Sequence, residues 1–153
     1  MAEDRIEREI MIAAPRERVW EIITQAEHVG TWFGDSAEVD LRPGGAIVLR
    51  WDKYGTMHGI IEKVDKPHTF SYRWNPGIKD EQPATETSTL VEFTLTSQGA
   101  QTRVRVVESG FSRLQRTESD RAEQFKDNYD GWATQLADLQ QYVEQLPVQP
   151  SER

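Results

Sequence analysis

The C-terminal part of the chain carries its longest regular pattern of apolar positions. The apolar residues are spaced alternately four and three apart, which places them on one face of a single helix; they are Phe125, Tyr129, Trp132, Leu136, Leu139, Val143 and Leu146. Thr117 and Asp120 have the spacing of a capping box that opens a helix, and Pro147 is expected to end it. The pattern therefore predicts one helix over residues 118–146, which would span roughly 43 Å.

The N-terminal part changes from a strand pattern to a helical one. Residues 6–12 alternate between apolar and mostly polar positions, as in a strand with one buried face. Ala14-Pro15 then introduces a helical apolar face over residues 19–26, since proline fits the first turn of a helix. Residues 27–33 are expected to add a further helical turn. One strand and two short helices are predicted here.

The middle of the chain alternates between apolar strand patterns and turns rich in glycine and proline. The expected strands cover residues 37–41, 47–51, 57–64, 69–74, 90–95 and 102–108. Residues 75–88 are polar and are expected to form a long loop that acts as a lid. The fold class is thus α+β: a curved antiparallel sheet of about seven strands is the expected partner of the long C-terminal helix.

Composition and charge exclude several classes of protein. The 153 residues fit one domain, expected over residues 1–146 with a flexible tail at 147–153. The net charge of −8 argues against nucleic-acid binding, and the absence of cysteine excludes thiol catalysis and cysteine-based metal sites. About 18 consecutive apolar residues, which a membrane span would require, occur nowhere in the sequence. A cytoplasmic protein is the expectation.

Few residues are candidates for catalysis. Glu108 follows Val104 and Val106 on the inward register of a strand, where a carboxylate removed from water would suit proton transfer; alternatively it pairs with an arginine or caps a turn near Gly110. His58 could shuttle protons, or it could lie half-exposed on the outer face of the sheet. The spacing of the histidines fits no metal site, and the chain lacks a phosphate-binding loop, so neither a metal nor a cofactor is expected.

Six segments in order along the chain resemble landmarks of the START-like, or Bet v 1-like (SRPBCC), superfamily, and most closely of its Hsp90-ATPase-activator-homologue family. They are residues 14–24, Trp32-Phe33-Gly34, Arg42-Pro43-Gly44-Gly45, residues 70–74, residues 108–111 and Gly131-Trp132. The resemblance implies a helix-grip fold with a cavity between sheet and helix. Relatives bind lipids, hormones or polyketides, a few catalyse cyclisation or hydrolysis, and the founding co-chaperones bind Hsp90. Those co-chaperones carry a separate N-terminal domain that this sequence lacks, so Hsp90 interaction is a minor alternative.

The sequence as a whole favours a binding protein over an enzyme. We expect a small, largely apolar ligand between the sheet and the C-terminal helix, oriented by Tyr72 and Glu108, in a monomer or homodimer. The expected wall residues are Trp51, Tyr72, Trp74, Glu108, Phe111, Phe125, Tyr129 and Trp132. The alternatives are a cyclase or hydrolase that uses Glu108 or His58 as its base, and a protein-interaction module.

Overall fold

The computed structural model describes residues 4–53, 55–75 and 88–146. Its elements in chain order are β1 (Arg5–Ile12), α1 (Arg16–Thr24), α2 (Ala26–Trp32), β2 (Ser36–Val39), β3 (Ala46–Trp51), β4 (Gly55–Asp65), β5 (Thr69–Trp74), β6 (Thr89–Gln98), β7 (Gln101–Ser109), the short 3₁₀ helix η1 (Phe111–Arg113) and α3 (Glu118–Gln145). The predicted order of strand, two short helices, six strands and one long helix is confirmed. The 3₁₀ helix η1 was not predicted.

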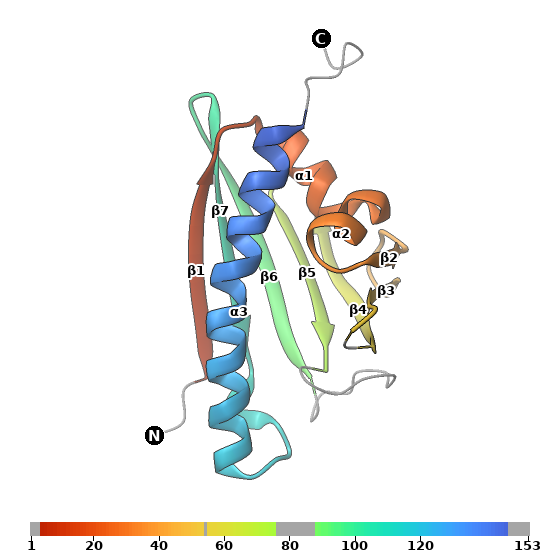
Figure 1. Ribbon diagram of the computed structural model, residues 1–153, viewed down its shortest axis with the longest axis vertical. Coiled ribbons are helices and arrows are strands. Elements are labelled where there is room, and N and C mark those ends of the chain that lie inside the picture. The colour runs from red at the N-terminus through yellow and green to blue at the C-terminus, as the bar shows by residue number, and fades with distance from the viewer. Residues whose placement is uncertain (1–3, 54, 76–87, 147–153) are drawn as a thin grey trace.

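The strands form one antiparallel sheet in the order β1-β7-β6-β5-β4-β3-β2. In Figure 1, α3 lies along one face of this sheet, and α1 and α2 lie on the same side, next to the C-terminal half of α3. The predicted α+β helix-grip architecture is therefore confirmed. Because β1 and β7 are neighbours, the first and last strands of the chain lie together beneath α3.

The core lies between α3 and the sheet, and α3 contributes Trp132, Leu136, Leu139 and Val143 to it. Thr117 caps the helix by accepting a hydrogen bond from the Asp120 backbone N–H at 3.1 Å, as predicted.

The seven residues of the predicted apolar stripe are not all buried, and the exception in the middle of α3 is Tyr129. This residue is 42% exposed, because it lies at the edge of the helix–sheet contact, where the Arg8 guanidinium packs 3.7 Å from its ring centroid. Phe125 and Leu146, at the two ends of the stripe, are only partly buried against the core.

Several sequence expectations fall on residues that the structure does not describe. The expected lid is one of them, since of residues 75–88 only Asn75 and Ser88 are described; the expected tail and the role of Pro147 are the others. In the described part of the chain, none of the helices is long and apolar enough to cross a membrane.

Candidate functional site

Glu108 lies between α3 and the sheet, near the end of β7. The alternation of β7 turns its side chain to the same face as the buried Val104 and Val106, and its neighbours across the ladders are Ile6 on β1 and Val91 on β6. Its exposed fraction is 0%. A carboxylate in such apolar surroundings requires hydrogen-bond donors that replace water.

Four neutral donors meet this carboxylate. Oε2 accepts from Trp74 Nε1 at 2.8 Å and from Thr89 Oγ1 at 2.5 Å. Oε1 accepts from Trp132 Nε1 at 2.8 Å and from Asn128 Nδ2 at 2.9 Å. The alternatives of an arginine pair or a turn cap at Gly110 are therefore wrong; Gly110 instead donates its own backbone N–H to Asp4.

A series of hydrogen-bonded side chains that begins at Arg116 fixes which groups donate to Oε1. Arg116 can only donate, and its Nη1 lies 3.2 Å from Gln124 Oε1. Gln124 Nε2 then donates to Asn128 Oδ1 at 2.8 Å, which leaves the Asn128 amide nitrogen facing Glu108. Oε1 thus receives two N–H donors.

The two indoles belong to an aromatic cluster centred on Phe33. Phe33 follows α2 and donates its backbone N–H to Val29, and Gly34 then turns the chain with a φ of 126°, a conformation that favours glycine. The Phe33 ring centroid lies 5.8 Å from that of Trp74 and 5.5 Å from that of Trp132, and those of the two tryptophans are 6.0 Å apart.

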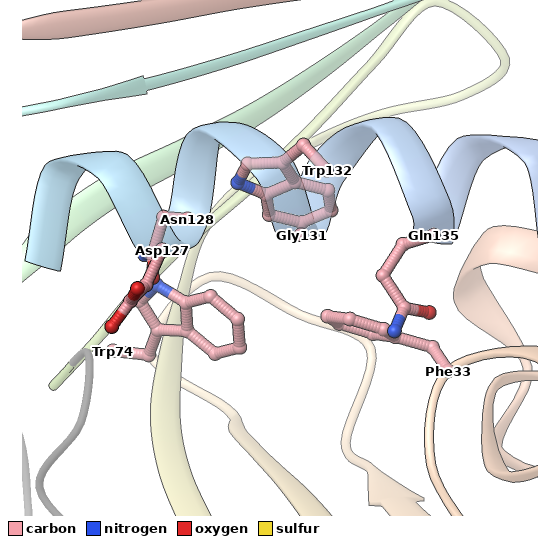
Figure 2. Close-up of a pocket in the computed structure, with 7 residues that line it drawn as sticks. All are labelled: Phe33, Trp74, Asp127, Asn128, Gly131, Trp132 and Gln135. Atoms are coloured by element: carbon pink, nitrogen blue, oxygen red, sulfur yellow. The ribbon is translucent and has the colours of Figure 1, made fainter.

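A pocket of about 160 Å³ lies beside these three rings. Its lining residues are Phe33, Trp74, Asp127, Asn128, Gly131, Trp132 and Gln135. Figure 2 shows the indole nitrogens of Trp74 and Trp132 turned toward the Asn128 end, whereas Gln135 lies next to Phe33 at the opposite end. Asp127 is exposed and stands at the mouth, and Gln135 Oε1 is buried with no hydrogen-bond partner in the described part of the chain.

Gly131 leaves space in this pocket. It lies within α3, where glycine is less favourable than alanine by about 0.5–1 kcal/mol. A Cβ built at this position would meet no atom within 4 Å, so packing does not require glycine there. Its missing side chain instead keeps that wall of the pocket open.

Of the eight expected wall residues, only Trp74 and Trp132 line the pocket. The other six lie elsewhere for separate reasons. Glu108 is behind the indoles, and Trp51 packs edge-on against Phe33 with a centroid distance of 5.6 Å. Phe111 and Phe125 pack on each other at 5.3 Å, and Tyr129 lies on Phe125.

Tyr72, the sixth, faces the core rather than the pocket. It is 1% exposed, and its hydroxyl has no hydrogen-bond partner among the described residues. Burial, together with the nearby Glu108 charge, raises the pKa of Tyr72 well above its ordinary value. The expectation that Tyr72 and Glu108 orient a ligand directly is therefore not met by this pocket.

His58 lies on the outer face of the sheet. It stands opposite Val48 on β3, whose neighbours Ile47 and Leu49 face the core. The alternative of a half-exposed outer histidine is thus confirmed. In the described ranges, His, Asp and Glu side chains form no group of three or more that could hold a metal ion.

Sequence reasoning did not predict five of the residues that line the pocket, namely Phe33, Asp127, Asn128, Gly131 and Gln135, nor Thr89, which donates to Glu108. Two signals could have found some of them. Thr89 is the cross-strand partner of Trp74, and Asn128 precedes Trp132 by one helical turn, so each lies beside a predicted site residue.

Solved structures share this fold. A protein from Mesorhizobium loti, MLL2253, aligns with a TM-score of 0.78 and 23% identity over 94% of this chain and 99% of its own. The Aha1 dimer from Colwellia psychrerythraea aligns with a TM-score of 0.75 and 20% identity over 94% and 98%. DynU16, from the dynemicin biosynthetic locus, aligns at 0.73 and 22% over 94% of this chain and 48% of its own. At these identities the likeness shows the fold alone.

The family is shown by the sequence itself. Among curated proteins none matches this chain. The model of the family described as Activator of Hsp90 ATPase homolog 1-like protein matches residues 13–144. Since this match covers most of the chain and agrees with the helix-grip fold, the protein belongs to the Activator of Hsp90 ATPase homolog 1-like family of the START-like superfamily.

Proposed function

We propose that the protein binds a small, largely apolar molecule in the pocket beside Phe33, Trp74 and Trp132. The observation that carries this proposal is the combination of three aromatic rings with one buried, unpartnered acceptor, Gln135 Oε1. Mostly apolar walls with a few convergent polar groups are typical of small-molecule sites.

The size of the pocket limits the ligand. Its 160 Å³ is below the range of about 300–1,000 Å³ that drug-sized ligands occupy. An apolar cavity of about 150 Å³ holds one benzene molecule. The part of a ligand that enters this pocket is therefore the size of one ring or of a compact branched group.

An enzymatic role has less support. Glu108 is fully buried, with both of its oxygens accepting hydrogen bonds, and it does not line the pocket. His58 is on the opposite face of the sheet. Neither residue can reach a molecule in this pocket without rearrangement of the core.

A substitution at Gly131 tests the proposal. We expect phenol, used as a one-ring probe, to shift the indole N–H resonances of Trp74 and Trp132 in ¹H–¹⁵N spectra and to raise the melting temperature by mass action. Gly131→Leu should fill the open space and abolish both effects.

Ala133→Leu is the matched control, because it adds the same side chain to an exposed position of α3. This variant should bind phenol like the parent protein. If phenol leaves both indole resonances unmoved, or if Gly131→Leu binds it as well as the parent does, the proposal is wrong.

A further inference from the structure

The residues described as lining the pocket carry charge of one sign. Among the described residues that line it, the only ionisable group is the Asp127 carboxylate, and neither lysine nor arginine occurs. The protein as a whole carries a net charge of −8. A negatively charged ligand would therefore meet repulsion and no cationic partner.

A second negative charge lies behind the aromatic wall. Glu108 receives the N–H groups of both Trp74 and Trp132 at 2.8 Å, and all four of its donors are neutral groups. Its charge is thus spread over hydrogen bonds and not cancelled by a cation among those donors. In a buried site such a charge acts over a longer distance than in water.

The hydrogen bonds to Glu108 also act on the rings themselves. The face of an aromatic ring is negative because of its quadrupole, and tryptophan has the strongest attraction for cations. An N–H group that donates to an anion is polarised so that electron density moves toward the ring. Both indole faces at this pocket are therefore expected to be more negative than those of a free tryptophan.

We infer that the ligand is an organic cation whose alkylated ammonium group lies against Trp74 and Trp132. This inference rests on the proposed function and names the class of its ligand. An alkylated ammonium has an apolar surface that suits the three rings, and it needs no hydrogen-bond acceptor of its own. Asp127 at the mouth adds attraction as the cation approaches.

A matched pair of probes separates charge from shape. Choline and 3,3-dimethyl-1-butanol have the same branched head, but only choline is charged. We expect choline to bind about tenfold more tightly than the neutral alcohol in calorimetric titrations, as a cation–aromatic contact out of water allows. Tetramethylammonium should compete with choline for the site.

Two carboxylates on α3 supply the variant and its control. Asp127→Asn should weaken choline binding about twofold to fivefold while the neutral alcohol is unaffected, because the lost charge is exposed. Asp130→Asn removes another exposed carboxylate, which pairs with Lys126 and does not line the pocket, so both affinities should stay unchanged.

Glu108→Gln removes the buried charge. If this variant folds, the preference for choline over the alcohol should fall at least threefold, with phenol binding retained. If it does not fold, the Asp127→Asn comparison decides alone.

The inference is overturned if the alcohol binds as tightly as choline, or if choline does not bind while phenol does. In both cases the proposed function survives. If phenol does not bind, or if Gly131→Leu leaves all binding unchanged, the proposed function fails as well.

Discussion

Trp74 on β5 and Trp132 on α3 donate their indole N–H groups, each at 2.8 Å, to different oxygens of the same carboxylate. Oε2 of Glu108 also accepts a hydrogen bond from Thr89 on β6, so both donors to this oxygen belong to the sheet. Oε1 also accepts a hydrogen bond from Asn128, so both donors to this oxygen belong to α3. A single buried side chain therefore joins the two layers of the fold.

Replacement of Glu108 is expected to destabilise the protein in proportion to the donors left without an acceptor. Glu108→Gln leaves at least one indole N–H facing an amide N–H, which costs about 1–3 kcal/mol of unfolding free energy. Glu108→Leu orphans all four donors and should cost more. Urea unfolding measures both, with Glu123→Gln on the exposed face of α3 as a control expected within about 0.5 kcal/mol of the parent. Equal effects of Glu108→Gln and the control would contradict this role.

The apolar stripe of α3 predicts unequal effects of its aromatic residues. Trp132 is 3% exposed, so Trp132→Ala should lower the unfolding free energy by about 3–5 kcal/mol. Tyr129→Ala, at an exposed position, should lose about 0.5–1 kcal/mol, mainly its contact with Arg8. Chemical denaturation of the two variants side by side tests this order. A similar loss for both would show that the buried face of α3 is assigned incorrectly.

Because the buried hydroxyl of Tyr72 is unpartnered among the described residues, its removal is not expected to lower the stability of the protein. This hydroxyl has no hydrogen-bond partner among the described residues, and its desolvation is costly, so Tyr72→Phe should leave the stability at neutral pH unchanged or raise it by up to about 1–3 kcal/mol. A clear loss of stability would mean that the hydroxyl has a partner in the folded protein.

The same residue predicts a loss of stability at alkaline pH. Because the folded-state pKa of Tyr72 is raised well above 10.0, the folded protein keeps a proton that the unfolded chain releases. The contribution of the protonated Tyr72 hydroxyl to the unfolding free energy is fully present below pH 10 and is lost as the pH rises above that value. Tyr72→Phe should reduce this alkaline decline, as followed by unfolding curves at increasing pH. Identical pH profiles for variant and parent would contradict the raised pKa.

Gly131→Ala should raise the unfolding free energy by about 0.5–1 kcal/mol, because alanine is the better helix former and its Cβ meets open space. Thermal unfolding monitored by circular dichroism measures the effect. Ala133→Gly, at an exposed site of the same helix, should change the stability by a similar amount in the opposite direction. Destabilisation by Gly131→Ala would show that the helix needs glycine for packing.

The fold could be predicted because apolar periodicity reports directly on the faces of helices and strands. Even where the strand ends differ by a few residues, the alternation that turns Glu108 inward is local to β7. The register of His58 was ambiguous because β4 contains an irregularity between Ile61 and Lys63, which changes the face that later residues occupy.

The site was less predictable because it depends on distant pairings. Thr89, Asn128 and Gln135 are small or polar residues whose local pattern does not distinguish them from surface positions. The size of the pocket depends on how the Phe33, Trp74 and Trp132 rings pack, and no spacing in the sequence encodes those angles.

Because the two oxygens of Glu108 bind donors from different layers of the fold, their hydrogen bonds should break in a defined order when the protein opens locally. If α3 separates from the sheet, Oε1 loses Asn128 and Trp132, whereas the bonds from Trp74 and Thr89 to Oε2 lie within the sheet and can persist. The indole proton of Trp132 should therefore exchange with solvent deuterium before that of Trp74. The exchange rate of the Trp132 indole proton thus reports the separation of α3 from the sheet, and that of the Trp74 proton reports the opening of the sheet itself.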